Sequence, residues 1–589
     1  MVSYDGVGAD LAWGWLEDGV LDNPDGVSGM VSEGTAARRV RMVDPTLTAV
    51  NHIALVTGAL PQASGIVSNY FHPAGAPITR GISGFSAPIE AETLWQAARR
   101  RGKRVGILTW PGANDSTPAR GGDFGLTWPA RPLAASAIDE LDPARASSAS
   151  VLASNDGLPA RVWTVPVKLP GSKPEVVSFT VTVVDGDPDG LAIYDTVAVQ
   201  GPATDEVQLL GRDHWFALSF SAKGPGEDHA YTYGAWCKVL RLDRERGSIR
   251  LYLGAVNRTY AYPQAFAERL SAAVGPWPGV PDGQMLSQWW LDMGKGIDLD
   301  TYLEQGKRLD RWLDAVAGEV IAHERFDLLL AYHPTPDEYE HAALILDKRQ
   351  WAWSPGSELA AHEGLKQVGR SFDRSVASLW GFLNPRRDTL VVVSDHGLVP
   401  LYDEVKINQA LATEGLVTTV ESNGRPRPAA DTPMLAYTSG GCAHLYLNLE
   451  GREPGGVVKP KAAPELLRRA ARVLADLSSG GEPVVERIFT REQAARIGLD
   501  SVNSGDLIVF LRPGYAASAA LGGKVIEPTR YYGQHGYLAS HDQLCGIFFA
   551  RGPEVAHRRL KELQATDIAP MVARWAGIGT LTGGKMVGR

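Results

Sequence analysis

Short apolar runs alternate with amphipathic stretches of helical length along most of the chain. Residues 91–98 have helical spacing and lead into the apolar run 105–110, and residues 302–322 lead in the same way into 326–332. A helix followed by a buried strand is the unit from which α/β sheets are built. Residues 388–394 have the continuous apolar character of a central parallel strand. We therefore predict an α/β fold with a mostly parallel central sheet flanked by helices.

Other stretches extend this pattern to both ends of the chain. Residues 2–4 are expected to be the end of a core strand, because a strand-to-loop exit follows them. Residues 359–383 predict a long helix, and residues 565–576 predict a closing helix. The apolar runs 506–511 and 545–550 are predicted to resume the core.

A different texture occupies the middle of the chain, from about Val162 to Leu253. β-branched and aromatic runs alternate there with short turns such as Asp185-Gly186-Asp187-Pro188. We predict a β-rich insertion over residues 156–264, within an α/β domain formed by residues 1–155 and 265–589. The sequence is equally compatible with two roles for this insertion: covering one edge of the main sheet, and acting as a substrate lid.

Length and composition limit the class of protein. A chain of 589 residues exceeds what one hydrophobic core usually fills, so one large domain with insertions or two domains are expected. A smaller subdomain is predicted over residues 405–503. The net charge of -9 comes without a basic face, which argues against a nucleic-acid polymer as partner. The three cysteines form no metal-binding or disulfide pattern.

The sequence also bears on compartment. No run of about 18 apolar residues is present, so no membrane span is predicted. No signal peptide is recognisable, and the chain opens directly with a strand. This abrupt start leads us to expect a missing N-terminal leader, in which case the protein would be periplasmic or secreted. The sequence predicts no oligomeric state.

Acidic residues stand where three of the predicted strands end. Asp5 follows the first strand, Asp337 follows the strand 326–332, and Asp395 and His396 follow the strand 388–394. Parallel sheets place their sites beyond the carboxyl ends of the strands. We expect these side chains to meet at one edge of the sheet.

Two more histidines extend this acidic set. His341 lies four residues after Asp337, so both face the same way on a helical turn, and His535 lies between two glycines. Carboxylates and imidazoles together suit a pair of divalent metal ions, zinc first and manganese second. Two such ions about 4 Å apart serve as a clamp for in-line phosphoryl transfer.

Thr48 supplies a hydroxyl at the head of an apolar helical run. A helix N-terminus favours an alkoxide or a bound phosphate, although a threonine there also serves as an ordinary helix cap. Asn69 follows 21 residues later, where an amide donor and a turn residue are both compatible with the sequence.

These motifs, in this order, carry a family resemblance. The chain resembles the type I phosphodiesterase/nucleotide pyrophosphatase branch of the alkaline phosphatase superfamily at Asp5-Gly6, Thr48, Asn51-His52, Thr57-Gly58, Pro61, Gly65-Ile66, Asn69, Asp337-x-x-x-His341, Ser394-Asp395-His396-Gly397, His535-Gly536-Tyr537, Ala550-Arg551-Gly552-Pro553 and Thr566–Pro570.

The resemblance implies an alkaline phosphatase-like fold and a metal-dependent phosphoester hydrolase acting on a small-molecule substrate. It implies a phosphodiesterase or nucleotide pyrophosphatase with a phosphothreonine intermediate. The implied roles are Thr48 as nucleophile, Asp5, Thr48, Asp395 and His396 as ligands of one metal, Asp337, His341 and His535 as ligands of the other, Asn69 as a donor to the phosphoryl group, and Tyr332 as a wall of the substrate pocket.

The chain departs from the family at the residues after the nucleophile. Ala49-Val50 replaces the family's phenylalanine-proline, and Ser64 replaces a histidine. Without the aromatic ring of that phenylalanine, the sequence does not identify the substrate. A phosphomonoesterase, a phosphomutase and a metal-binding protein without activity remain as alternatives. Sulfatase chemistry is disfavoured because no C-x-P-x-R or S-x-P-x-R stretch is present, and a phosphonoacetate hydrolase because the expected lysines are absent near Trp110–Ala113.

Overall fold

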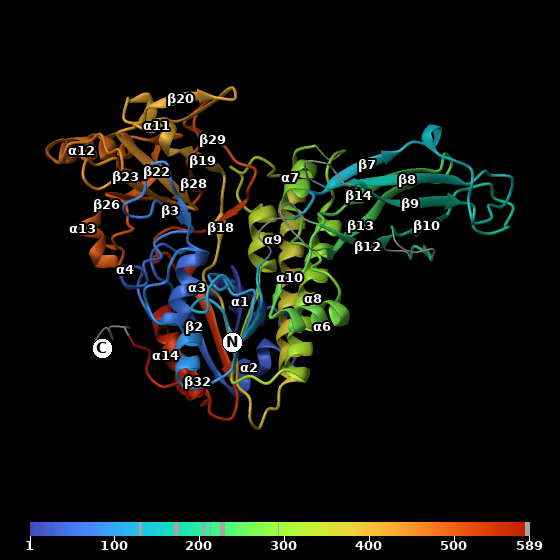
Figure 1. The fold of residues 1–589 in the computed structure, drawn as a ribbon, viewed down its shortest axis with the longest axis horizontal. Coiled ribbons are helices and arrows are strands. Elements are labelled where there is room, and N and C mark those ends of the chain that lie inside the picture. The colour runs from blue at the N-terminus through green and yellow to red at the C-terminus, as the bar shows by residue number, and fades with distance from the viewer. Residues whose placement is uncertain are drawn as a thin grey trace. The chain divides into compact units, whose positions relative to one another are not determined.

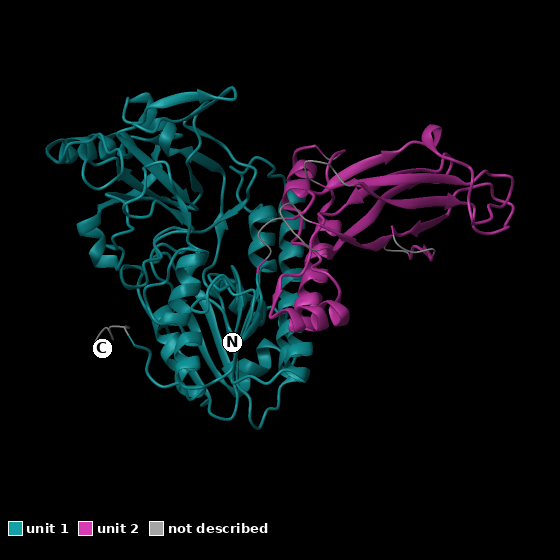
Figure 2. Cartoon of the chain, in the orientation of Figure 1, with its two compact units in different colours: residues 1–127, 317–589 teal, residues 128–316 magenta. Residues whose placement is uncertain are grey.

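The chain folds into two compact units. One comprises residues 1–127 and 317–589, and the other residues 128–316 (Figure 2). The computed structural model describes residues 1–128, 132–169, 176–202, 206–211, 214–223, 230–292 and 294–582. Among these residues, no helix has the length and apolarity needed to cross a bilayer.

One large sheet organises the first unit. Its strands lie in the order β6-β5-β16-β1-β17-β31-β2-β32, with β33 also beside β2. The neighbours from β6 to β17 are parallel, whereas β31 is antiparallel to β17 and β2. A mostly parallel central sheet is therefore confirmed. The strands are β1 (Val2–Tyr4), β2 (Thr35–Arg41), β5 (Val105–Leu108), β6 (Phe124–Leu126), β16 (Leu328–His333), β17 (Leu390–Val393), β31 (Gly546–Arg551), β32 (Arg558–Leu560) and β33 (Leu563–Gln564).

Helices cover both faces of this sheet (Figure 1). Phe548 packs against Trp575 of α14, whereas the next residue, Phe549, meets Trp13 of α1. Successive strand residues point to opposite faces, so α14 and α1 lie on opposite sides. The helices that lie entirely within the first unit are α1 (Ala9–Glu17), α2 (Val27–Glu33), α3 (Thr48–Thr57), α4 (Pro61–Ser64), α5 (Leu94–Arg100), α9 (Thr335–Ala343), α10 (Pro355–Phe382), α11 (Ile407–Thr413), α12 (Ala463–Ala475), α13 (Arg491–Ala494) and α14 (Ala565–Trp575), of which α11, α12 and α13 belong to the region of the smaller antiparallel sheets.

The two apolar runs predicted to resume the core belong to different sheets. Residues 545–550 contribute β31 of the main sheet, but residues 506–511 form β27 (Leu507–Leu511) in the separate antiparallel sheet β22-β23-β27-β26. An apolar run identifies a buried strand without identifying its partners. The remaining strands of this region are β19 (Asp403–Lys406), β20 (Thr419–Ser422), β21 (Arg425–Pro428), β22 (Met434–Ser439), β23 (Cys442–Leu447), β24 (Ser478–Ser479), β25 (Glu482–Pro483), β26 (Val485–Thr490), β28 (Tyr515–Ser518) and β29 (Ile526–Pro528).

The second unit contains two antiparallel four-stranded sheets, β11-β10-β9-β8 and β12-β13-β14-β7. They share a core in which Phe179 and Phe216 have ring centroids 5.8 Å apart. The predicted β-rich insertion lies within this unit, and its lid role stays a prediction. The elements are β7 (Ala137–Leu141), β8 (Arg161–Lys168), β9 (Val176–Val184), β10 (Thr196–Gln200), β11 (Val207–Leu209), β12 (Trp215–Ala222), β13 (Tyr231–Asp243), β14 (Ser248–Leu253), α6 (Gln264–Val274) and α7 (Gly283–Leu291), while α8 (Leu299–His323) continues into the first unit.

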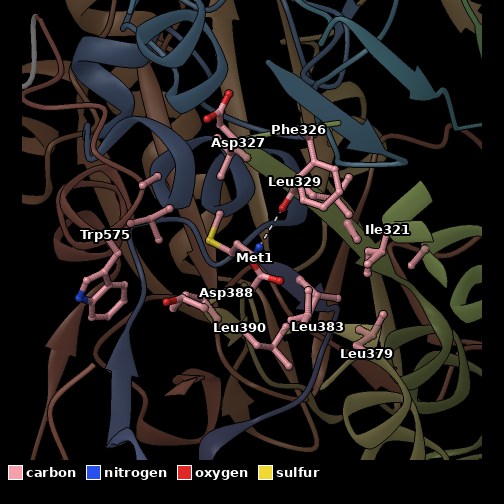
Figure 3. Close-up of a pocket in the computed structure, with 18 of the residues that line it drawn as sticks. Met1, Ile321, Phe326, Asp327, Leu329, Leu379, Leu383, Asp388, Leu390 and Trp575 are labelled. Atoms are coloured by element: carbon pink, nitrogen blue, oxygen red, sulfur yellow. Dashed lines mark hydrogen bonds between the residues drawn. The ribbon is translucent and has the colours of Figure 1, made fainter. Parts of the chain in front are cut away.

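A cavity of about 200 Å³, lined by both apolar and polar groups, lies at the amino-terminal edge of the main sheet (Figure 3). Its lining includes Met1, Leu328 and Leu390, which stand at the start of β1, β16 and β17. The Met1 amino group donates a hydrogen bond of 2.8 Å to the Leu329 carbonyl there. The acidic residues predicted to form the site belong to the opposite edge.

Candidate active site

Three neighbouring strands end at one edge of the sheet and carry the predicted acidic residues. Val2 of β1 pairs with Ala331 of β16 on one side and with Val392 of β17 on the other. Because all three strands are parallel, their carboxyl ends lie together. Asp5 follows β1 and Asp395 follows β17, and α9 with its ligand pair begins just after β16.

Asp5, Asp395 and His396 form the first triad at this edge. The His396 Nε2 atom lies 3.0 Å from Asp395 Oδ2 and 3.5 Å from Asp5 Oδ1. All three side chains are buried, and each offers a ligand atom within 4.8 Å of the others. The Thr48 hydroxyl is 3.3 Å from the same His396 nitrogen. The structure thus brings Thr48 to the first triad.

Asp337, His341 and His535 form the second triad. Asp337 Oδ2 is 3.4 Å from His341 Nε2, and Asp337 Oδ1 is 3.9 Å from His535 Nε2. The spacing of four residues on α9 places Asp337 and His341 on one face of the helix, as predicted. The two triads adjoin, since the rings of His396 and His535 stack with centroids 3.7 Å apart.

Backbone carbonyls orient both histidines of the second triad. His341 Nδ1 is 2.8 Å from the Gly533 carbonyl, and His535 Nδ1 is 2.9 Å from the Thr46 carbonyl. A carbonyl only accepts hydrogen bonds, so Nδ1 carries the proton in each ring and Nε2 keeps a free lone pair. A metal-binding histidine is typically held in this way by its other nitrogen.

The first triad has the electrostatics of carboxylates assembled to receive a cation. Burial raises the pKa of Asp5 well above its usual value, and the charges of Asp395 and Asp337 raise it further. Burial also opposes ionisation of Asp395, but the neighbouring His396 and His52 hold the pKa of that carboxyl well below its usual range. Asp5 Oδ1 and Asp395 Oδ2 are buried without a hydrogen-bond partner.

The second triad shows the same features. Burial raises the pKa of Asp337 well above its usual value, and the nearby carboxylates Glu338, Asp395 and Glu340 add to the effect. Burial lowers the pKa of His341 to about 4 and that of His535 well below its usual value, so both imidazoles are neutral near pH 7.

Both triads therefore fit divalent metal ions. Buried carboxylate oxygens without partners are costly unless a cation or donor meets them. Neutral imidazoles and ionised carboxylates are the donor types that zinc and manganese accept. The observation supports the metal assignment made from the sequence, and the identity of the ions stays a prediction.

The nucleophile candidate stands at the first position of α3. The residue before it, Leu47, caps the helix without a side-chain hydrogen bond, and Thr48 itself is 8% exposed. Its hydroxyl faces His396 instead of the helix backbone. Asn69 Oδ1 accepts a hydrogen bond of 2.9 Å from the Ala49 amide. This contact fixes the Asn69 amide beside Thr48 and leaves its NH₂ group as the donor available to a ligand.

Tyr332 has a contact that the sequence did not suggest. Its hydroxyl donates a hydrogen bond of 2.6 Å to Asp5 Oδ2, and the ring is 8% exposed. Its predicted role in substrate binding stays a prediction. What the structure adds is that Tyr332 orients a ligand of the first triad.

His52 belongs to the motifs of the family resemblance, but no role in the site was predicted for it from the sequence. Its Nδ1 is 2.9 Å from the Thr48 carbonyl and 3.3 Å from Asp395 Oδ2, while Nε2 lies 2.9 Å from the Ser3 hydroxyl. The signal available was its spacing, because a residue four positions after Thr48 on a helix lies on the same face.

Comparison with known proteins places this site in a family. The family model described as type I phosphodiesterase / nucleotide pyrophosphatase matches residues 1–196 and 217–538. Venom phosphodiesterase 2 of Crotalus adamanteus is 28% identical over 117 residues, which is 19% of this chain and 14% of that protein. Human ectonucleotide pyrophosphatase/phosphodiesterase family member 7 is 30% identical over 124 residues, which is 19% of this chain and 24% of that protein. These matches span less than a quarter of the length of either relative.

Among solved structures, human ectonucleotide pyrophosphatase / phosphodiesterase 5 aligns over 98% of this chain and 94% of its own, with 13% identity and a TM-score of 0.48. The family model covers most of the chain, from the first strand to the loop that carries His535. The chain belongs to the type I phosphodiesterase/nucleotide pyrophosphatase family.

Proposed function

We propose that this protein hydrolyses small-molecule phosphodiesters through a phosphothreonine formed at Thr48, with two divalent metal ions held by the two triads. The observation that carries the proposal is the convergence of one hydroxyl, a buried Asp/His triad and a partly buried Asp/His triad at the carboxyl edge of the sheet. Family membership supports the same reaction class.

The residues would divide the chemistry as follows. Asp5, Asp395 and His396 would hold one ion beside Thr48, and Asp337, His341 and His535 would hold the other. Bound there, the ions would lower the pKa of the Thr48 hydroxyl and neutralise charge on the phosphoryl and leaving oxygens.

The Thr48 oxygen would attack phosphorus and displace the first alcohol, so that an Oγ1–P bond forms as the P–O bond to the leaving group breaks. Water would then cleave the phosphothreonine, which regenerates Thr48 and releases a phosphomonoester. The Asn69 NH₂ group would donate to a non-bridging phosphoryl oxygen throughout. The N-terminus of α3 adds a positive partial charge at the same place.

Metal removal and substrate choice test the proposal together. Wild-type protein should hydrolyse a nitrophenyl phosphodiester, lose that activity on dialysis against a chelator, and recover it when zinc or manganese is added back. We expect kcat/KM for the diester to exceed that for nitrophenyl phosphate. A preference for the monoester would favour a phosphatase, and phosphoryl transfer to a sugar acceptor without turnover in water would favour a mutase. Full activity in metal-depleted protein would refute the proposal.

Tyr332→Phe is expected to lower kcat/KM for the diester by about 10- to 100-fold, the usual effect of removing a partner that orients a metal ligand. The reason is that Asp5 Oδ2 loses its 2.6 Å hydrogen bond. Zinc affinity, measured by competition with a chromophoric chelator, should fall in parallel.

Tyr446→Phe is the matched control for this variant. It also removes a hydrogen bond from a buried tyrosine, here one of 2.7 Å to the Asn503 carbonyl, but leaves the triads untouched. If both variants lose zinc affinity equally, Tyr332 has a structural role only.

A further inference from the structure

A second group of carboxylates lies far along the chain from the triads, in the connection between β9 and β10 of the second unit. Asp185, Asp187 and Asp195 each place a carboxylate oxygen within 4.8 Å of the others. Two further aspartates lie near enough to act on this group: the charges of Asp156 and Asp189 raise the pKa values of Asp185 and Asp187. Five acidic side chains therefore share a connection of about a dozen residues and the turn beside it.

Asp185 is the observation that distinguishes this group from an ordinary acidic surface. Its side chain is fully buried, at 0% exposure, and neither of its carboxylate oxygens has a hydrogen-bond partner. Its backbone, in contrast, is fully bonded. The Asp185 amide donates to the Ser154 hydroxyl, and its carbonyl accepts from both the backbone and the side-chain amide of Asn155.

The surrounding hydrogen bonds hold the other acidic residues around the same point. Asp195 Oδ1 accepts from the Gly186 amide at 2.8 Å, and Asp156 Oδ2 accepts from the Gly190 amide at 3.0 Å. Both contacts fold the connection between the strands back toward Asp185. A buried carboxylate without a partner is costly, and two further carboxylates with oxygens within 4.8 Å increase that cost unless a cation joins them.

The sequence of this loop has the order of a calcium-binding loop. Residues 185–190 read Asp-Gly-Asp-Pro-Asp-Gly, which is the D-x-D-x-D-G pattern whose alternating carboxylates surround Ca²⁺. Gly190 has φ of 81°, so the glycine stands where the backbone needs the left-handed region. The flanking elements are strands instead of helices, and Asp195 stands one position before the place of the usual closing glutamate.

We propose that the β9–β10 connection is a calcium site, in which Asp185, Asp187 and Asp195 bind one Ca²⁺ ion. Calcium suits the site because it takes six to eight oxygen ligands in flexible geometry, whereas zinc sites usually include nitrogen or sulfur. The charge of Arg244 lowers the pKa of Asp187, whereas the main causes that raise the pKa of Asp185 are burial and the charges of four neighbouring aspartates. The ion would hold the two ends of the β9–β10 connection, at Asp185 and Asp195, together.

Calorimetric titration of the zinc-loaded full chain with CaCl₂ tests the site. We expect one Ca²⁺ ion per chain, an affinity between about 10⁻⁶ and 10⁻³ M, and weaker binding of MgCl₂. Thermal unfolding should shift upward with calcium, since a ligand that binds only the folded state stabilises it. Absence of a calcium-dependent heat and of a shift in Tm would overturn the proposal and leave Asp185 as a protonated buried acid.

Substitutions locate the ion. Asp185→Asn and Asp187→Asn should each weaken calcium binding by at least about 100-fold, above the range seen for partners that only support a ligand. Asp300→Asn, an exposed aspartate at the start of α8, is the matched control and should bind calcium like wild type. Asp337→Asn, which alters the second triad, should also keep the calcium response. Loss of binding only in Asp337→Asn would place the calcium in the catalytic centre and refute the site.

The variants also report on folding. Removing a buried charge that lacks a partner should leave the Tm of calcium-free Asp185→Asn equal to or above that of calcium-free wild type. Asp187 is exposed, so Asp187→Asn should fold whatever Asp185 contributes. A calcium-free Asp185→Asn that is markedly less stable than wild type, combined with normal calcium binding in Asp187→Asn, would show a structural carboxyl and no ion site.

Discussion

Thr48→Ala is expected to lower kcat/KM for a nitrophenyl phosphodiester by about four orders of magnitude or more, as removal of an enzyme nucleophile does. The variant deletes the hydroxyl, which faces His396 at 3.3 Å, together with the γ-methyl group. Thr48→Ser keeps a hydroxyl on the same carbon and should retain most of the activity. The measurement is initial-rate kinetics of both variants with zinc in excess.

The fold should survive this substitution. Thr48 does not bond to the backbone amides of α3, and Leu47 occupies the cap position, so no helix cap is lost. Unfolding transitions of wild type and Thr48→Ala should agree to within about 0.5 kcal/mol. Acid quenching during turnover should leave phosphate on Thr48 in wild type, detectable by mass spectrometry. Activity of Thr48→Ala above a tenth of wild type, or phosphate on another residue, would exclude Thr48 as nucleophile.

Most of the fold could be predicted from the sequence because buried parallel strands produce continuous apolar runs. Residues 388–394 are such a case, and they form β17 beside β1 in the main sheet. The pairing partners of the strands were harder to predict. The run that forms β27 has the same apolar character, yet it pairs with β23 and β26, since pairing depends on contacts remote in sequence.

The triads could be predicted from the sequence for a related reason, since strand exits in a parallel sheet meet at one edge. Asp5 and Asp395 are 390 positions apart in the chain but follow adjacent strands. The contacts of the residues that orient the triads could not be predicted from the sequence. Tyr332 lies within β16 and His52 within α3, where each has the pattern of a core residue, and only the folded structure shows their contacts with Asp5 and Asp395.

The acidic loop of the second unit shows a different limit. From sequence, Asp185 and Asp187 have the composition of a turn between strands, because Asp, Gly and Pro are the usual turn residues. The burial of Asp185 and the absence of hydrogen bonds to its carboxylate are properties of the packing. Composition therefore identified the turn, and packing identified its unusual carboxylate.

Asp5→Asn should have opposite effects on activity and on the stability of the metal-free protein. We expect kcat/KM to fall by about three orders of magnitude, equivalent to about 4 kcal/mol of transition-state stabilisation, because the proposed metal ligand Asp5 loses its charge. Without metal, however, the wild-type carboxylate is buried with Oδ1 unpartnered. The amide removes that buried charge, so the metal-free variant should be more stable by about 1–3 kcal/mol at pH 7, the range for a buried polar group left unsatisfied.

The stability difference between metal-free wild type and Asp5→Asn depends on pH. The folded-state pKa of Asp5 is raised above its ordinary value of 3.8, so the folded state binds the proton more tightly than the unfolded state. Below about pH 3.8 the carboxyl is protonated in both states, and this source of difference between wild type and Asp5→Asn disappears. As pH rises toward the folded-state pKa, metal-free wild type loses stability relative to the variant, and the difference stays constant above it.

Zinc should reverse the order, because an ion that binds only the folded state stabilises the protein with the intact ligand set. Urea denaturation of wild type and Asp5→Asn at pH 4 and pH 7, with and without zinc, measures all of these differences. Asp10→Asn is the matched control, since Asp10 is an exposed aspartate on α1 and should show no zinc-dependent reversal. If Asp5→Asn is the less stable protein at pH 7 in the absence of metal, the Asp5 carboxylate stabilises the fold by itself, and its burial cannot be attributed to a bound cation.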